Sequence, residues 1–285
     1  MDRILVATDF STRSDRALRR ATLIARQVGA SLTLVHVVDA DRLERLVNAE
    51  RDAASSILEE SVRTLADSDG IAADPLMMIG DVHAGILEAA DQVDAELIIV
   101  GPHRSRLRDV FVGTTAERVV RRSRRPLLVA VQPPSAPYQR TLLALDFDEA
   151  SKAAGRAAVD MGVFEHTHVT VMHAFDAPAE AMMRRTMEQA DVIDNYVEAE
   201  REQATGRLRE LAAELGLTPS GQRVVAIVGT PARTILETAQ SEDAHLIVMG
   251  TSQRKGFERL LIGSVTENVI RDAHRDILIV PTDVD

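Results

Sequence analysis

The residues best suited to chemistry lie in a glycine-bounded loop in the second half of the chain. The apolar run of residues 246–249 is expected to be a strand that ends at Gly250; a polar loop follows, and Gly263 and Ser264 open a helical pattern. Ser264 and Glu267 have the spacing of a capping box, which predicts a helix whose free N–H groups are directed at the loop. Unpaired amides and the helix dipole both favour negative charge, so this pattern predicts an anion-binding corner.

The first half of the chain carries nearly the same arrangement. An apolar run at residues 97–100 ends at Gly101, and Gly113 and Thr114 form the second turn, with Thr114 and Glu117 at the capping spacing. The loop is one residue shorter than its counterpart in the second half. Because glycines and flanking residues recur at fixed shifts, the chain contains two copies of one unit.

An aspartate follows the first predicted strand of each copy, Asp9 in the first and Asp146 in the second. Ligands of open parallel sheets bind beyond the carboxyl ends of the strands, where strand order reverses, so each acid is expected to share a crevice with the glycine turns. An acidic side chain can lie near a ribose, and backbone amides and a hydroxyl can bind phosphate, so this set of groups suits a nucleotide. Such an Asp is also a common turn former, and capping alone explains Ser264 and Thr114.

Alternating strand and helix patterns must position these residues. In the first half the predicted strands are 4–7, 31–38, 76–79, 97–100 and 127–131, and the predicted helices are about 11–28, 41–65, 83–92 and 114–123. Strands separated by such helices imply right-handed crossovers and a parallel sheet that is covered on both faces. The second half repeats this order with twelve extra residues in and around its long helix, between residues 175 and 222.

Three prolines between residues 133 and 137 separate the copies, because proline fits neither a sheet nor a helix interior. We therefore expect a first domain at residues 1–132, a linker at 133–139 and a second domain at 140–285. The predicted fold class is α/β, with two tandem open parallel five-stranded sheets that carry helices on both faces.

Composition and charge exclude several classes of function. The 285 residues include no cysteine, which removes disulfides, thiol catalysis and cysteine metal clusters. The net charge of −11 argues against general nucleic-acid binding.

No apolar run reaches the roughly 18 to 20 residues of a membrane span, and the start of the chain does not resemble a signal peptide. The eight histidines show no metal-ligand spacing, and we find no Walker motif or general base, so neither a metal nor catalysis is expected.

The chain resembles the universal stress protein family in these motifs, specifically its tandem two-domain members. The resemblance covers essentially the whole length of the chain. Family members that bind ATP carry Gly-x2-Gly-x9-Gly-Ser/Thr after the fourth strand, and the second half keeps this spacing with Gln253 in place of the middle glycine. The resemblance implies the fold shared with adenine-nucleotide hydrolases and an intramolecular pseudo-dimer joined through the last strands. It also implies a cytoplasmic stress-response protein that binds ATP or a related nucleotide without turnover.

The same resemblance assigns nucleotide contacts by position. In the second domain these are Asp146, Gly250, Gln253, Gly263, Ser264, Val265 and Thr266. In the first domain the weaker counterparts are Asp9, Gly101, Gly113 and Thr114.

Other hypotheses stay open at the level of sequence. The chain could be a ligand-free interaction module with degraded nucleotide motifs and unidentified protein partners, and a homodimer of the tandem chain is also compatible with it. Arg104, Arg106 and Arg108 lie where phosphates would arrive in the first half, which predicts an anion site made by arginine. His36 and His173 end matching strands and are explained either by a place in the crevice or by packing with one bonded ring nitrogen.

Overall fold

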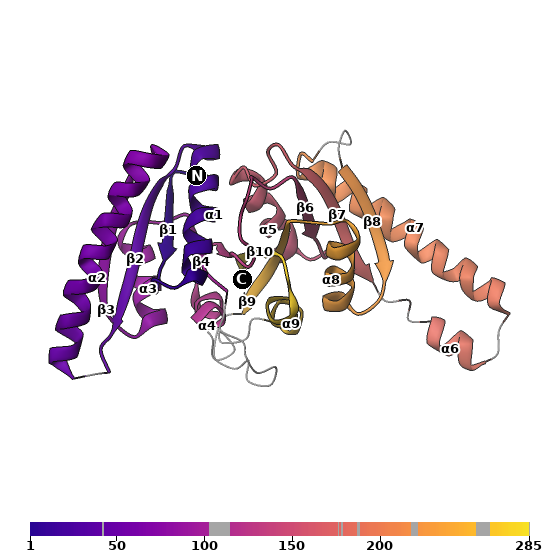
Figure 1. Cartoon of the computed structure of the whole chain (residues 1–285). Coiled ribbons are helices and arrows are strands. Elements are labelled where there is room, and N and C mark those ends of the chain that lie inside the picture. The colour runs from indigo at the N-terminus through magenta and orange to yellow at the C-terminus, as the bar shows by residue number, and fades with distance from the viewer. Residues whose placement is uncertain are drawn as a thin grey trace.

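Two α/β halves lie side by side in the computed structural model of the chain (Figure 1). The structure describes residues 1–41, 43–102, 115–175, 177, 179–186, 189–217, 222–254 and 263–284. The first half contains β1 (Arg3–Ala7), α1 (Thr12–Val28), β2 (Ser31–Asp39), α2 (Glu44–Thr64), a π-helical turn (Leu65–Asp69), β3 (Ala73–Gly80), α3 (Val82–Gln92), β4 (Leu97–Val100), α4 (Thr115–Arg122) and β5 (Leu127–Val129). The second half contains β6 (Arg140–Ala144), α5 (Glu149–Asp160), β7 (His168–Phe175), α6 (Glu180–Arg185), α7 (Ala190–Glu214), β8 (Gln222–Val228), α8 (Pro231–Ser241), β9 (Leu246–Arg254), α9 (Ser264–Asp272) and β10 (Asp276–Val284).

The strands of the described residues form one sheet in the order β3-β2-β1-β4-β5-β10-β9-β6-β7-β8. Pairing is parallel within each half, and the halves join through the antiparallel pair β5–β10, where Leu128 lies opposite Leu278. The predicted α/β class with two tandem five-stranded parallel units is confirmed. The last strand of each unit merges the two sheets into one.

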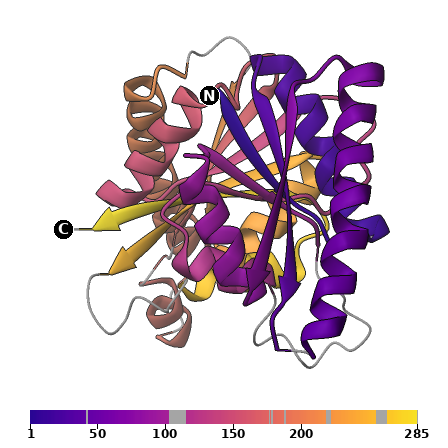
Figure 2. The ribbon, with the colours of Figure 1, turned by 90° about the vertical axis from the view of Figure 1, so that its left-hand side faces the viewer.

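Helices cover both faces of this sheet (Figure 2). Successive residues of a strand point to opposite faces, so Ile4 packs in one core layer and Leu5 in the other. The layer of Ile4 lies under α1, α2, α5 and α7, and the layer of Leu5 lies under α3, α4, α8 and α9. This two-sided burial explains why the strands consist of nearly continuous Val, Ile and Leu.

Helix α1 forms where the sequence predicts it. The Ser11 side chain accepts from the backbone N–H groups of Arg13 and Ser14, and Gly29 ends the helix in the left-handed region at φ 75°. These are the preferred residues for the two ends of a helix. The alanines of the inner face allow α1 to lie close to the sheet beside the first cleft.

Two predicted boundaries near the second glycine loop are wrong. Strand β9 does not end at Gly250 but continues to Arg254, because β10 also extends and pairs with it up to Val284. Helix α9 is capped by Gly263, at φ 82°, and Ser264 is its first helical residue, so the predicted capping box of Ser264 and Glu267 does not form. The backbone N–H of Glu267 instead donates to the Gly263 carbonyl at 3.0 Å.

The extra residues of the second half build a helical arm. Helix α6 and the first turns of α7 extend beyond the sheet at the lower right of Figure 1. The backbone N–H of Ala179, just before α6, donates to the Tyr196 hydroxyl of α7 at 3.4 Å, and Ile193 is buried. The described helices include none with the combined length and apolarity of a membrane span.

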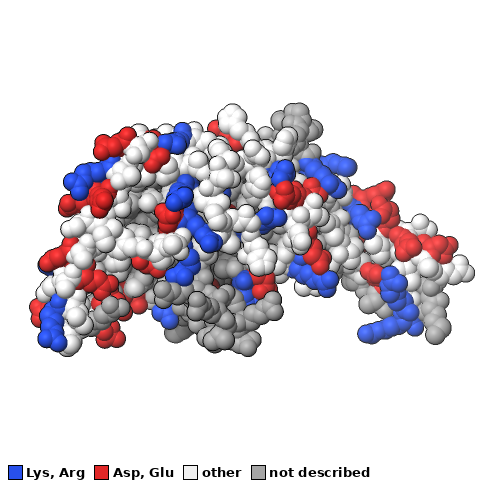
Figure 3. All heavy atoms as spheres, viewed as in Figure 1, with Lys and Arg blue, Asp and Glu red and all other residues white. Residues whose placement is uncertain are grey.

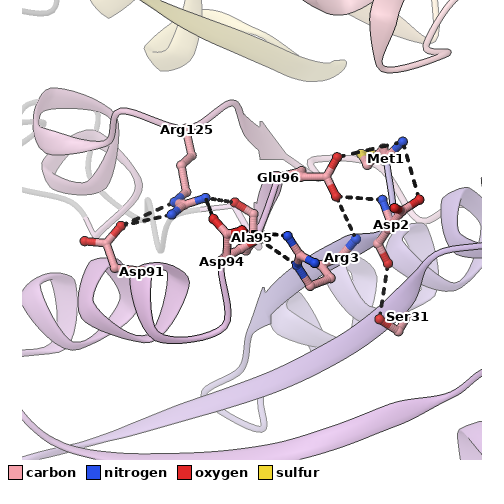
Figure 4. Close-up of polar contacts among 9 residues, drawn as sticks. All are labelled: Met1, Asp2, Arg3, Ser31, Asp91, Asp94, Ala95, Glu96 and Arg125. Atoms are coloured by element: carbon pink, nitrogen blue, oxygen red, sulfur yellow. Dashed lines mark hydrogen bonds and ion pairs between the residues drawn. The ribbon is translucent and has the colours of Figure 1, made fainter.

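An arginine clamp fixes the amino-terminal edge of each half. In the first half, Arg3 donates to the backbone carbonyl of Asp94 at 2.9 Å and to its carboxylate at 2.7 Å, and Arg125 donates to the same carboxylate at 3.2 Å (Figure 4). Asp94 has φ 49°, in the left-handed region that a non-glycine residue rarely adopts. These bonds stabilise that conformation.

The second half repeats this clamp. Arg140 donates to the carbonyl and the carboxylate of Asp243, and Arg275 donates to the same carboxylate at 3.3 Å. Asp243 also has a positive φ, of 46°. The duplicated unit has therefore kept its polar contacts as well as its strands and helices.

Candidate functional site

Each half has a cleft at the carboxyl ends of its strands. These strand ends lie toward the lower side of Figure 1. The strand order explains the position: β1 lies between β2 and β4, and β6 lies between β7 and β9, so the chain crosses to opposite sides at this edge. The clefts are the geometric candidates for ligand sites.

The first cleft has a volume of about 1290 Å³, including its open mouth. Asp9 and Gly101 both line it, as predicted. The Asp9 carboxylate accepts from the backbone N–H of Ser11 at 3.0 Å and lies 3.9 Å from the Arg13 guanidinium. Burial alone would raise the pKa of Asp9, but hydrogen bonds from Ser11 and Ser14 and the charge of Arg13 outweigh it and lower the pKa. Asp9 is therefore a carboxylate at neutral pH.

The second cleft has a volume of about 850 Å³ by the same measure. It brings together five residues that the sequence predicted: Asp146, Gly250, Gly263, Val265 and Thr266. The carboxylate of Asp146 is exposed and accepts from the backbone N–H of Phe147 at 2.8 Å. It thus keeps acceptor capacity for a ligand.

The start of α9 is the anion-binding element of this cleft. No described side chain caps the helix, because its N-cap is Gly263. The first N–H groups of α9, at Ser264, Val265 and Thr266, are the ones that a helix leaves without an internal partner. Such groups, together with the positive end of the helix dipole, bind phosphates and carboxylates in many proteins.

The remaining predicted contacts do not all gather at the clefts. The Gln253 backbone lies in the β9–β10 ladder opposite Asp283, so the position of the middle motif glycine belongs to a strand. Gly113, Thr114 and the arginines at positions 104, 106 and 108 lie outside the described residues.

Packing also accounts for two of the glycines. A Cβ atom at Gly101 would lie 2.7 Å from the carbonyl oxygen of Arg13, and a Cβ atom at Gly250 would lie 2.8 Å from the Cβ of Ala154. Both distances are shorter than real Cβ contacts. Gly101 therefore permits α1 to start directly over the end of β4, and Gly250 permits α5 to start directly over β9, which shapes the clefts whether or not they bind a ligand.

The histidines of β2 and β7 occupy equivalent positions near the carboxyl ends of these strands. The Nδ1 atom of His36 lies 2.8 Å from the carbonyl oxygen of Thr8, and that of His173 lies 2.9 Å from the carbonyl oxygen of Leu145. A carbonyl oxygen can only accept, so each Nδ1 carries the proton. Each histidine both packs with one bonded nitrogen and lines its cleft.

An aromatic ring beside each histidine was not among the predicted site residues. The ring centroids of Phe10 and His36 are 4.5 Å apart, and those of Phe147 and His173 are 4.3 Å apart. The sequence does contain a signal for these pairs, because Phe10 and Phe147 recur at the same shift as His36 and His173.

The described residues include no group of three or more His, Asp or Glu side chains that could hold a metal ion. Both clefts contain a carboxylate, apolar walls and a histidine ring, and the second cleft also contains the start of α9.

Comparisons with known proteins agree with this architecture. The model of the universal stress protein family matches residues 1–131 and again residues 137–281. A universal stress protein of Mycolicibacterium smegmatis is 24% identical over 97% of this chain and 96% of its own length. A universal stress protein of Methanocaldococcus jannaschii is 29% identical over 50% of this chain and 82% of its own length. The crystal structure of a universal stress protein from Archaeoglobus fulgidus has a TM-score of 0.72 at 20% identity, covers 98% of each chain and shows the same fold.

Proposed function

Because the chain belongs to the universal stress protein family, and is a tandem member of it, we propose that its second-domain cleft binds ATP or a related nucleotide. The nucleotide is held without turnover, and the protein acts in the stress response by binding. We place it in the cytoplasm and divide it into domains at residues 1–132 and 140–285, joined by a linker at 133–139.

The observation that carries this proposal is the free start of α9 opposite Asp146. Gly263, at φ 82°, turns the chain into the helix without a side chain, and nothing within 4 Å would meet a Cβ there. Phosphates would bind the amides at Ser264, Val265 and Thr266, and Asp146 would accept from the ribose hydroxyls. The base would lie against the apolar walls formed by Ala174 and Ile235.

Gln253 stands at the position of the middle motif glycine. A glycine at the middle motif position can give its amide to a phosphate or adopt a positive φ. The Gln253 backbone is instead part of the β9–β10 ladder. The proposal therefore assigns phosphate binding to the helix start alone, and we expect weaker binding than in a cleft with both elements.

Calorimetric titration of ATP into protein freed of bound nucleotide by acid or denaturant and refolded tests the proposal. Wild type should bind, and Gly263→Val should reduce the affinity tenfold or more because a β-branched side chain disfavours the turn. Gly216→Val is the matched control: Gly216 also has a positive φ, of 71°, and open space around it, and it ends α7 away from the cleft. It should affect stability and leave ATP binding intact.

Two results would contradict the proposal: no heat of binding with wild type, or equal affinity in Gly263→Val. Release of inorganic phosphate from bound ATP faster than in buffer would contradict the absence of turnover.

A second candidate function is supported by the helical arm. Met182 of α6 is 69% exposed and Val192 of α7 is 42% exposed, and large apolar side chains at an exposed tip are typical of interaction surfaces. In that case the chain presents the arm to a protein partner. A variant in which both residues are serine would then lose partner capture while keeping ATP binding.

A further inference from the structure

We propose that the cleft of the first domain binds a small organic cation, an aliphatic amine, against His36 and the carboxylates beside it. This goes beyond the nucleotide site of the second domain, and it concerns a different cleft.

His36 of β2 is the first of the groups that would hold the amine. The residue is 7% exposed, and its Nδ1–H donates to the Thr8 carbonyl. In the neutral ring Nε2 is then an acceptor. Within the described part of the chain, this Nε2 is a buried side-chain atom without a hydrogen-bond partner. Such atoms are rare in native proteins and mark a place where a donor is missing.

The surroundings of Nε2 are acidic. Oε1 of Glu50, on α2, lies 4.0 Å from it, and both side chains line the cleft. Asp9 and Asp39 line the same cleft, and Arg13 is the basic residue among its lining, 3.9 Å from Asp9. On the face shown in Figure 3, acidic side chains gather at the lower left, where β2 and β3 end. The charges of these described side chains favour a cation.

An ammonium group fits these partners better than a neutral donor does. It offers three N–H donors, accepts nothing and carries a positive charge, which suits a cleft with acidic side chains in its lining. It can donate to Nε2 of His36 and to Glu50 at once. Hydrogen bonds with a charged partner are roughly twice as strong as neutral ones.

The walls of the cleft define the rest of the ligand. Val37, Val82, Ile86 and Val100 line it on the side of α3. Burial of each CH₂ group against such a wall favours binding through the hydrophobic effect. An alkyl chain attached to the amine is therefore the complementary body.

In the second domain a cation lies over the phenylalanine of the Phe–His pair. There the guanidinium of Arg207, from α7, lies 4.0 Å from the ring centroid of Phe147, which contacts His173. In the first domain the equivalent Phe10 is 37% exposed, and the described residues place no cation over its ring. Phe10 also has φ 56°, a strained value for an aromatic residue. The first half thus leaves open a position that an arginine fills in the second.

The test is calorimetric titration of the full chain with 1,4-diaminobutane and butylamine, with 1-butanol and butyrate as uncharged and anionic probes of similar length. Both amines should bind, and the alcohol and the acid should not. His36→Leu and Glu50→Gln should each weaken amine binding about tenfold or more. Glu59→Gln, an exposed carboxylate on the same helix, is the matched control and should bind as wild type does.

The ¹⁵N chemical shift of His36 Nε2 gives an independent readout, because this shift should change only if the ammonium group donates a hydrogen bond to Nε2. Equal binding of butanol and butylamine would overturn the proposal, as would unchanged amine affinity in both variants. The absence of any amine binding would also overturn it and would leave water as the partner of Nε2. Gly263→Val should leave amine binding intact, so failure at this site is separable from failure of the nucleotide site.

Discussion

Nε of Arg20 lies 2.9 Å from the carboxylate of Asp276, although 256 residues separate them in the chain. Arg20 is on α1 of the first domain, and Asp276 begins β10 of the second. Asp276 is 0% exposed. This ion pair ties the two halves together beside the antiparallel strands that join their sheets.

Every oxygen of the Asp276 carboxylate is used. One accepts from Arg20 and from the Tyr138 hydroxyl at 2.7 Å, and the other accepts from the backbone N–H groups of Val131 and Gln132 at 2.8 and 3.0 Å. Burial, followed by the charge of Asp276, raises the pKa of Tyr138 well above its usual value, so the phenol stays a donor. The cluster therefore also fixes the segment between β5 and β6, which contains Val131, Gln132 and Tyr138.

Removal of this carboxylate is expected to cost stability. Asp276→Asn leaves Arg20 buried without its counter-charge, and breaking a buried ion pair typically costs about 3–5 kcal/mol. Urea unfolding of the full chain measures the loss. Asp67→Asn, at an exposed position, serves as the control and should change the free energy of unfolding by less than about 0.5 kcal/mol. A loss for Asp276→Asn as small as that of the control would show that the cluster does not hold the halves together.

The cleft glycines should be required for packing. Gly101→Ala brings a Cβ against the Arg13 carbonyl, and Gly250→Ala brings one against Ala154, so each should lower the free energy of unfolding by about 1–3 kcal/mol. Gly206→Ala provides the contrast, because Gly206 lies inside α7 with nothing within 4 Å. Alanine there should stabilise by about 0.5–1 kcal/mol. If all three variants had the same unfolding midpoint in urea, the close approach of helix and strand would not be what selects glycine.

His83 should make stability depend on pH below neutrality. Burial lowers its pKa, and although Asp81 raises it, the charges of Arg122 and Arg118 add to the lowering. Its Nε2 accepts from Arg122, as a neutral ring can. Because the folded pKa is below the unfolded value of about 6.5, the unfolded chain binds the proton more tightly. Stability is therefore greatest above that value and falls as the pH drops towards the folded pKa.

Urea unfolding at pH 7.5 and pH 5.5 checks this expectation. His83→Gln should show a smaller loss between the two pH values than wild type, whereas His168→Gln, at an exposed position, should match wild type. The same slope in His83→Gln and wild type would mean that other groups account for the pH dependence.

Several features could be predicted because they depend on neighbours in the sequence. Ser11 and Gly29 end α1 as expected, since capping is a local contact between a side chain or a turn and the adjacent helix. The order of strands and helices followed from apolar periodicity, and the duplication followed from residues repeated at fixed shifts. Asp9, Asp146, Gly101 and Gly250 were therefore placed at the cleft edges correctly.

The boundary errors have a common cause. The strand was expected to end at Gly250 because the apolar run of residues 246–249 ends there, but the length of β9 is set by its pairing with β10. Ser264 was expected to cap α9 because its side chain can, but the positive φ of Gly263 places the cap one residue earlier. In both cases a tertiary or backbone constraint overrode local preference.

The sequence by itself determined that this protein is two copies of one α/β unit, with an acid, glycine turns and a helix start at each crevice, because these features are periodic or local. Only the tertiary structure decided which side-chain contacts tie the copies together and how their clefts differ. The merged sheet, the buried pair of Arg20 and Asp276 and the unpartnered nitrogen of His36 depend on contacts between residues far apart in the chain. Such contacts are set by which surfaces pack together, and no spacing in a single sequence records them.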